Sequence, residues 1–284
     1  MSASLRSLAR GGRSFAFASR LLPPPDRERV ARLYSYCRAV DDLVDEQSTR
    51  PAAELHGLLD DWLDRSRAAH AGRPSDDSVI DAAMGELRRS EVPFVHVEQL
   101  VAGMRMDIVP RRYDGLADLS IYTTRVAGVV GVMMCGLFDV RSRWLLERAS
   151  MLGCAMQLTN IVRDVGDDLE RGRLYLPQSL LRSYGVTETE LRDMRRGLRP
   201  ISPAYRAAIE SLLATADGDY RRAFEAVPHL PGAFRRTVAV AAEVYRGIHD
   251  VVRESGYDNL TRRATTTLTR KWALGVAGLR RAAA

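Results

Sequence analysis

Two groups of aspartates, far apart in the sequence, have a spacing that suits chemistry on a charged substrate. Asp41 and Asp45 lie four residues apart in RAVDDLVDE (residues 38–46), so on a helix both side chains leave the same face. A like-charged pair at this spacing costs an isolated helix roughly 0.2–0.5 kcal/mol, so it calls for a compensating partner. Arg38 and Tyr34 continue this face toward the N-terminus. A solvated surface patch is the alternative interpretation.

The second group lies in CAMQLTNIVRDVGDDLERGR (residues 154–173), where polar side chains recur every three or four positions. On a continuous helix with 3.6 residues per turn they return to nearly the same side. The flanking positions are apolar and suit a core face. Because buried polar groups need partners, this polar stripe is expected to line a cavity. Its members are Gln157, Asn160, Asp164 and Asp168.

If the two groups face each other, a cation must lie between them, since carboxylates about 4 Å apart repel by about 4 kcal/mol at an effective dielectric constant near 20. Oxygen ligands without sulfur or imidazole favour Mg²⁺, with Mn²⁺ as a substitute. Magnesium commonly completes its shell with water and phosphate oxygens, so we expect a phosphate ester substrate, most simply a diphosphate whose departure the metals assist. The predicted metal ligands are Asp41, Asp45, Asn160, Asp164 and Asp168.

Helices must position these residues, because apolar side chains recur three and four apart along most of the chain and no pair of strands is evident. Clusters of Pro and Gly divide the pattern at residues 23–26, 72–77, 172–177, 198–203 and 229–232. Asp26, Ser75 and Ser202 are predicted N-caps. The predicted fold is all-α, with about eight to ten helices, in a single domain covering residues 1–284.

Composition narrows the class of protein. The chain carries a formal charge of +6, and only Lys271 among its 42 basic residues is a lysine. Arginine suits phosphate and carboxylate, but these arginines are scattered among acidic residues, so no nucleic-acid partner is expected. Cys37, Cys135 and Cys154 are too few for a disulfide framework and fit the reducing cytoplasm. The basic N-terminus lacks the uninterrupted apolar stretch of a signal peptide.

Two segments bear on membrane contact. The apolar run VAGVVGVMMCGLF (residues 126–138) falls short of the roughly 20 residues that span a bilayer, which predicts a buried helix, either core or cavity lining. The C-terminal stretch LTRKWALGVAGLRRAAA (residues 268–284) combines a tryptophan, small apolar residues and basic ends. It suits an interfacial helix at a membrane surface or one packed on the bundle, and these alternatives stay open.

Three segments, taken in order, resemble the squalene/phytoene synthases, and the bacterial phytoene synthases most closely. They are RSFAFASRLLPPPDRERVARLYSYCRAVDDLVDE, RVAGVVG and QLTNIVRDVGDDLERGRLYLP. The resemblance runs from about Arg13 to Lys271, and two DxxxD motifs with their particular neighbours make it specific. It implies the isoprenoid synthase (class I terpenoid synthase) fold, a single-domain helical bundle with a central cavity.

The resemblance also implies roles for individual residues. The implied catalytic residues are Asp41, Asp45, Asp164, Asp168, Tyr122 and Arg38. The implied substrate-binding residues are Ser14, Phe15, Tyr34, Arg38, Gln157, Asn160, Arg163 and Arg173. The four aspartates are those that hold the magnesium cluster in the family. This chain departs from the family at residues 122–124, which read Tyr-Thr-Thr where many members have Tyr-Cys-Tyr.

The implied reaction joins two prenyl diphosphates head to head through a cyclopropylcarbinyl diphosphate. With two geranylgeranyl diphosphates it ends by proton loss and gives phytoene, without NADPH. Coupling of two farnesyl diphosphates to presqualene diphosphate, squalene or dehydrosqualene is one alternative. A class I terpene cyclase that acts on one prenyl diphosphate and a non-catalytic helical scaffold are the others.

Overall fold

The structure is a computed structural model that describes residues 2–11, 13–45 and 50–283. Within these ranges it contains fifteen α-helices and no strand, apart from an isolated bridge between Arg112 and Leu174. The predicted all-α class is confirmed. The helices outnumber the eight to ten expected, because several are only six to nine residues long, such as α10 (Val165–Glu170) and α11 (Gln178–Ser183).

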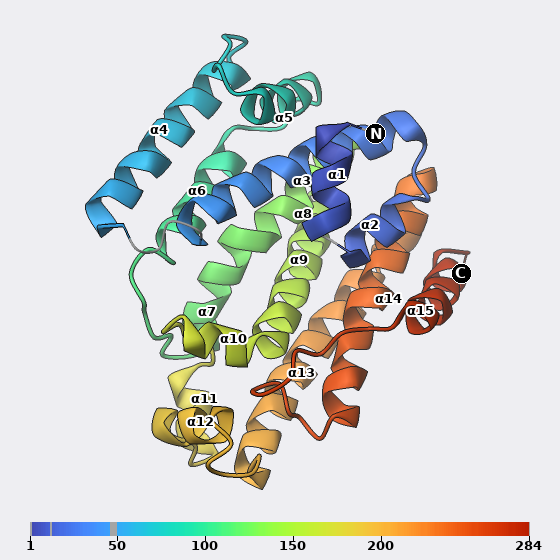
Figure 1. Cartoon of the computed structure of the whole chain (residues 1–284). Coiled ribbons are helices and arrows are strands. Elements are labelled where there is room, and N and C mark those ends of the chain that lie inside the picture. Colours follow the sequence, from blue (N-terminus) through green and yellow to red (C-terminus); the bar gives the residue numbers. More distant parts are fainter. Residues whose placement is uncertain (1, 12, 46–49, 284) are drawn as a thin grey trace.

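The long helix α9 (Arg143–Arg163) runs through the middle of the bundle (Figure 1). It packs against α8 (Val129–Leu137), α13 (Pro203–Phe224) and α14 (Gly232–Glu254). α3 (Pro24–Asp45) and α6 (Val95–Arg105) pack on α8, while α7 (Leu116–Thr123) contacts α9 and continues toward α8 (Figure 1). The two aspartate motifs therefore belong to helices that flank the same interior.

The remaining helices cover the outside of this bundle. α4 (Ala52–His70) and α5 (Ser78–Arg89) pack on each other and on α3, while α12 (Glu188–Arg195) joins α11 at the opposite end (Figure 1). α2 (Arg13–Ser19) packs against α1 (Ala3–Gly11), and its Phe17 ring meets Trp272 of α15 (Leu268–Ala283) edge to face. A short 3-10 turn, η2 (Val227–His229), links α13 to α14.

The caps show how local sequence sets the helix ends. Ser202 caps α13 as predicted, since its hydroxyl accepts a hydrogen bond from the Tyr205 amide. The other two predicted caps are wrong. Asp77, not Ser75, caps α5 through the amides of its first turn, and α3 begins at Pro24, which places Asp26 inside the first turn.

A five-residue π-helix, η1 (Thr124–Gly128), joins α7 to α8 where their helix packs closely on α9. A Cβ on Gly153 would lie 2.4 Å from the Ala127 carbonyl oxygen, and one on Gly131 would lie 2.4 Å from that of Ala149. Glycine is therefore required where these backbones meet. π segments often mark functional sites, and η1 carries Val126 and Ala127 into an apolar cavity.

The apolar run at 126–138 is longer as a helix than the sequence suggested. Because η1 joins it to α7, the continuous helix Leu116–Leu137 meets the length and composition of a membrane span, the one helix in the described ranges that does so. Half of its most apolar window is buried within the bundle. Met133, Cys135 and Leu137 belong to the core, which agrees with the predicted buried helix.

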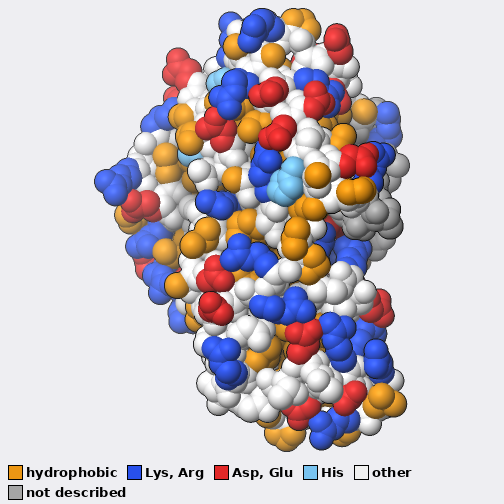
Figure 2. Space-filling model, turned by 90° about the vertical axis from the view of Figure 1, so that its left-hand side faces the viewer, with side chains coloured by type: hydrophobic (Ala, Val, Ile, Leu, Met, Phe, Trp, Pro, Cys, Tyr) orange, Lys and Arg blue, Asp and Glu red, His pale blue; other side chains and the backbone are white. Residues whose placement is uncertain are grey.

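The face that α4 presents carries basic and acidic side chains interspersed with apolar ones (Figure 2). Its ion pairs include Arg65 with Asp61 and Arg67 with Glu98. Basic and acidic charges alternate over this face instead of forming a stripe, which is typical of a solvated surface rather than of a nucleic-acid-binding one.

Candidate functional site

The first aspartate motif lies on a helix with a continuous apolar back. Leu33, Tyr36 and Val40 recur at three- and four-residue spacing on α3 and are fully buried in the core. Asp41 and Asp45 leave the other side of the helix and line a cavity of about 720 Å³. As predicted, the two carboxylates share one face.

The second motif does not lie on a continuous helix, which corrects the prediction. α9 ends at Arg163, and α10 begins at Val165. Asp164 lies at the junction with φ −107° and ψ 12°. The amide of Asp164 still donates to the Asn160 carbonyl and that of Asp168 to the Asp164 carbonyl, both at 2.9 Å. The polar stripe therefore stays on one side despite the break.

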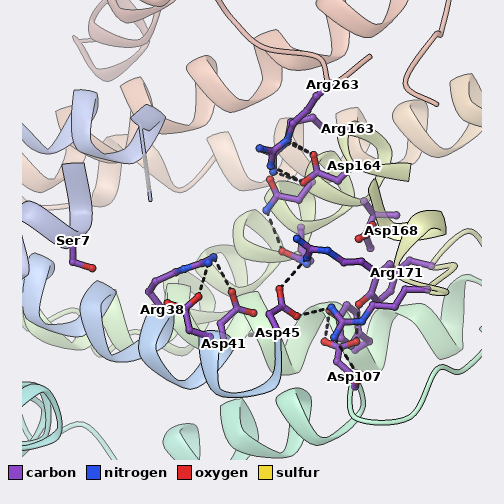
Figure 3. Close-up of a pocket in the computed structure, with 17 residues that line it drawn as sticks. Ser7, Arg38, Asp41, Asp45, Asp107, Arg163, Asp164, Asp168, Arg171 and Arg263 are labelled. Carbon is purple, nitrogen blue, oxygen red and sulfur yellow. Dashed lines mark hydrogen bonds and ion pairs between the residues drawn. The ribbon is translucent and has the colours of Figure 1, made fainter. Parts of the chain in front are cut away.

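Both motifs line the same polar cavity. Asp164 and Asp168 lie across it from Asp41 and Asp45, with arginine side chains between them (Figure 3). The wall also contains Asp107, at the end of α6. The full lining is Ser7, Arg38, Asp41, Asp42, Asp45, Asp107, Tyr122, Gln157, Asn160, Ile161, Arg163, Asp164, Asp168, Arg171, Arg173, Tyr175 and Arg263.

Arginines pair with the first motif. Arg38 donates to Asp41 at 3.0 Å. Asp45 accepts from Arg173 at 2.6 Å and from Arg171 at 3.2 Å, and both of these residues follow the second motif. The two sides of the cavity are thus bridged by ion pairs between guanidinium groups and carboxylates.

The two aspartates of the second motif differ in their partners. Asp164 accepts two hydrogen bonds from Arg163, at 2.8 and 2.5 Å, and two from Arg263, at 2.7 and 3.1 Å. Asp168 has no ion pair or hydrogen bond from a side chain in the described part of the chain. It is a partly exposed carboxylate that faces the cavity without a direct cationic partner.

The crowding of carboxylates changes their acidity. Burial and the Asp164 charge raise the pKa of Asp168 to about 7, against the opposing effect of two arginines. Burial and the Asp45 charge raise the pKa of Asp41 to about 6. Burial would also raise the pKa of Asp164, but its hydrogen bonds from arginine lower it overall. Ionisation therefore costs more at Asp41 and Asp168 than at Asp164.

The donor set of this cavity fits Mg²⁺. The Oδ1 atom of Asn160 is buried without a hydrogen-bond partner among the described residues, and Asn160 lines the cavity together with the aspartates. This amide oxygen and the unpaired carboxylate of Asp168, both on the cavity wall, are oxygen donors of the kind that magnesium prefers. No three His, Cys, Asp or Glu side chains in the described ranges converge closely enough to hold a metal as they stand. The arginine pairs hold the carboxylates in their present positions.

The polar cavity continues into an apolar one. A second cavity of about 670 Å³ shares Arg38, Asp41 and Asn160 with the first, and it adds Ser14 and Lys271. Gln157 and Asn160 also line a third cavity of about 290 Å³, whose wall is mainly apolar. A molecule with an anionic head at the aspartates can therefore extend an apolar tail toward the core of the bundle.

Every residue predicted for the site lies on this connected space. Asp41, Asp45, Tyr122, Arg38, Arg163, Arg173, Gln157, Asn160, Asp164 and Asp168 line the polar cavity, Ser14 lines the second, Tyr34 lines the second and third, and Phe15 lines the third. The Phe15 and Tyr34 rings stack with centroids 6.2 Å apart. The structure thus gathers the predicted residues, while their roles remain predictions.

Sequence reasoning missed Tyr175, Arg263 and Tyr245 in the walls of these cavities. The phenols of Tyr122 and Tyr175 both donate to Asp107, at 2.8 and 2.7 Å, and their rings lie 5.1 Å apart. Burial raises the pKa of Asp107, although these hydrogen bonds oppose the rise. Arg263 and Tyr245 also face the cavities. The signals in the sequence were the arginine doublet at 262–263 and, for Tyr175, its place in the GRLYLP stretch at 172–177.

A family model described as squalene/phytoene synthase matches residues 8–270. The chain belongs to this family. Among its relatives, a phytoene synthase of Cereibacter sphaeroides is 39% identical over 280 residues, which cover 96% of this chain and 77% of the relative. A phytoene synthase of Thermus thermophilus is also 39% identical, over 92% of this chain and 86% of the relative.

Solved structures agree with this membership of the squalene/phytoene synthase family. A dehydrosqualene synthase in complex with a ligand superposes with a TM-score of 0.86 at 28% identity, covering 97% of this chain and 93% of that one. The squalene synthase HpnC from Alicyclobacillus acidocaldarius gives a TM-score of 0.77 at 24% identity, over 89% and 93% of the two chains, and shows the shared fold. The predicted family and isoprenoid synthase fold are confirmed.

Proposed function

We propose that this chain is a Mg²⁺-dependent prenyltransferase that condenses two geranylgeranyl diphosphates head to head into phytoene, a step of carotenoid biosynthesis. The observation that carries the proposal is the polar cavity between the two aspartate motifs, which continues into an apolar cavity. The phytoene synthases that are 39% identical over nearly the whole chain support the choice of product. The reaction ends by proton loss and requires no NADPH.

The head of each substrate is a diphosphate, and the polar cavity offers it arginines in place of open water. Arg38, Arg163, Arg173 and Arg263 present planar donor groups that suit phosphate oxygens bidentately. Asp41, Asp45, Asn160, Asp164 and Asp168 would hold Mg²⁺, or Mn²⁺ in its place. When bound, the metal would neutralise the diphosphate and assist its departure.

Charge balance supports a need for added cations. The wall of the polar cavity contains Asp41, Asp42, Asp45, Asp107, Asp164 and Asp168 against Arg38, Arg163, Arg171, Arg173 and Arg263. The arginines thus nearly balance the aspartates before any substrate enters. A diphosphate adds further negative charge, which divalent ions between the aspartates would offset.

The apolar chains of the substrates extend past aromatic rings. Phe15 and Tyr34 stack on one side of the connected cavities, and Tyr245 lies in the wall of both the second and the third. An allylic cation formed here meets ring faces and apolar side chains, and water is kept away from it. Tyr122 lies where the polar and second cavities meet, with its phenol held by Asp107, and we assign it to stabilising this cation.

Incubation with labelled prenyl diphosphates tests the proposal. Geranylgeranyl diphosphate with Mg²⁺ and without NADPH should give a hydrocarbon with twice the carbon number. Faster coupling of farnesyl diphosphate would instead assign the squalene or dehydrosqualene type of reaction. A product with the carbon number of one substrate would assign a terpene cyclase, and no product from any substrate would leave the scaffold hypothesis.

Since residues from Ser7 to Lys271 line the connected cavities, we further propose that the chain works as one domain. The three cysteines are free, which supports a cytoplasmic location. Peripheral membrane contact would occur through α15, whose inner face packs on α14 through Gly275 and Gly278. Its outer face exposes a stripe of large apolar side chains, a feature of interfacial helices. The stripe consists of Leu268, Trp272, Val276 and Leu279.

A sedimentation assay with anionic phospholipid vesicles tests this contact. Replacing Leu268 and Trp272 by glutamate should release the protein from the vesicles while the fold is kept, because both side chains are at least 60% exposed. Leu198→Glu is the matched control, since Leu198 is 69% exposed in the loop between α12 and α13. Equal binding of the wild type and the α15 variant would contradict the membrane contact.

A further inference from the structure

The break between α9 and α10 leaves backbone groups that a continuous helix would have joined. In an unbroken helix the Val162 carbonyl would accept the amide hydrogen of Gly166, four residues on. Here both groups have the same partner elsewhere. The Nδ2 of Asn259 donates to the Val162 carbonyl at 2.5 Å, and the Gly166 amide donates to the Asn259 carbonyl at 3.2 Å.

Asn259 thus replaces the missing helical hydrogen bond and holds the Val162 carbonyl and the Gly166 amide apart. The segment around Asn259 lies very close to Gly166. A Cβ on Gly166 would lie 2.0 Å from the carbonyl oxygen of Leu260, the neighbour of Asn259, so the contact requires glycine at this position. Both Gly166 and Leu260 are buried. The break is therefore held by a specific packed contact.

The Asn259 side chain is itself held in orientation. Its Oδ1 accepts a hydrogen bond from the Tyr205 hydroxyl at 2.6 Å, which leaves Nδ2 to face Val162. Asn259 is 2% exposed, and Tyr205 is fully buried on α13. Because buried polar groups need partners, an apolar residue at 259 would leave both the Val162 carbonyl and the Tyr205 hydroxyl without one.

The same segment continues into the candidate active site. Four residues after Asn259, Arg263 makes its two hydrogen bonds to Asp164. Ala264, Thr265 and Thr266 then line the second cavity. The segment 256–267, here called the strap, is thus fixed at Asn259 before it passes over the site.

We propose that Asn259, oriented by Tyr205, is a positioning residue for the second aspartate motif. By holding the α9–α10 break open, it sets the directions of Asp164 and Asp168 into the cavity and delivers Arg263 to Asp164. Neither Asn259 nor Tyr205 lines any of the three cavities, so their effect on the site must pass through the backbone and the strap. The consequence for catalysis rests on the proposed function, whereas the effect on local geometry does not.

Substitutions at both positions test the proposal with a matched control. Asn259→Ala removes the bond to Val162, and Tyr205→Phe removes only the group that orients Asn259. Tyr36→Phe is the control, because Tyr36 is equally buried and its hydroxyl lies 2.9 Å from that of Ser66, on the far side of α3 from the site. Tyr205→Phe and Tyr36→Phe each lose one buried hydrogen bond and should lose similar thermal stability, whereas Asn259→Ala loses two and should lose more.

The first measurement needs no metal or substrate. Hydrogen exchange of the amides from Arg163 to Glu170 should be faster in Asn259→Ala than in the wild type, and unchanged in Tyr36→Phe. The second measurement is calorimetric binding of inorganic diphosphate with Mg²⁺. We expect roughly a 10- to 100-fold loss of affinity in Asn259→Ala, the usual effect of removing a group that orients a ligand, and a smaller loss in Tyr205→Phe. In Asn259→Ala, kcat should fall by a larger factor than KM rises.

Wild-type exchange rates and wild-type affinity in folded Asn259→Ala would overturn the proposal. So would an equal loss of affinity in Tyr36→Phe, since that would show a general effect of stability. If the wild type itself fails to bind diphosphate with Mg²⁺, the proposed function fails, and the exchange measurement still decides the role of Asn259.

Discussion

Replacing Asp168 by asparagine should stabilise the metal-free protein. The carboxylate lies opposite the first aspartate motif without an ion pair from the described residues, and burial together with the Asp164 charge raises its pKa to about 7. Above that pH the native state must hold a charge that the unfolded chain holds at less cost. Asparagine keeps the shape of the side chain and removes the charge.

The magnitude follows from the two pKa values. The ordinary value is 3.8, and the folded value is about 7, so the difference is worth up to about 4 kcal/mol at 1.36 kcal/mol per pKa unit. A carboxyl group whose pKa is higher in the folded protein than in the unfolded chain does not oppose folding at a pH below its unfolded pKa. As the pH rises from there toward the folded pKa, the group increasingly destabilises the native state. The gain from Asp168→Asn should therefore be near zero at about pH 4 and reach roughly 2–4 kcal/mol at about pH 8, or about 4–8 °C in Tm.

Thermal unfolding in EDTA at acidic and alkaline pH measures this effect. Asp167→Asn is the control, because Asp167 lies on the same short helix but is 53% exposed and outside the cavity wall. Its Tm should stay within about 1–2 °C of the wild type. Added Mg²⁺ and inorganic diphosphate should raise the Tm of the wild type more than that of Asp168→Asn. An unchanged or lower Tm of Asp168→Asn at alkaline pH in EDTA would refute the crowding argument.

Three further predictions use other parts of the chain. Asp41→Ala should lower kcat by roughly 10²–10⁴ in the product assay, because a carboxylate that anchors the leaving-group charge is lost, and near-wild-type turnover would contradict the metal site. Burial opposes ionisation of Asp217, but hydrogen bonds from His249 and Arg253 lower its pKa to about 2, so its stabilising contribution is lost as the pH falls from about 4 to 2. Chemical denaturation of Asp217→Asn should therefore show a smaller loss of stability over this range than the wild type, and an equal loss would contradict this role of Asp217. Gly166→Ala should lower the free energy of unfolding by about 1–3 kcal/mol through overpacking, whereas Gly57→Ala, with no atom within 4 Å of its Cβ, should raise it by about 0.5–1 kcal/mol. Equal calorimetric effects of the two substitutions would contradict the close contact between Gly166 and the Leu260 carbonyl.

Short-range spacing was enough to predict the candidate site in outline. Asp41 and Asp45 share a face because four residues make about one helical turn, and Gln157 lies near enough to Asn160 for a 3.2 Å hydrogen bond between their amides. The all-α fold followed from apolar periodicity in the same way. These features depend on residues within a few turns of each other, which a single sequence records directly.

The parts that sequence reasoning missed depend on distant residues. Arg263 lies 99 positions from Asp164, and Asn259 lies 97 positions from Val162. Spacing alone carries no information about such pairs. The break after α9 was missed for the same reason. Aspartate and glycine also occur within ordinary helices, and the residue that holds the break open, Asn259, belongs to the strap.

The two aspartate motifs consequently differ in what holds them in place. The first is carried by an unbroken helix of 22 residues, α3, whose buried back fixes the directions of Asp41 and Asp45 locally. The second depends on the α9–α10 junction, where Asn259 and Arg263 of the strap meet it from elsewhere in the chain. The side of the cavity formed by the second motif therefore depends on contacts with the strap, whereas the side formed by α3 does not. Changes in the strap should therefore alter metal and diphosphate binding while leaving the rest of the bundle folded.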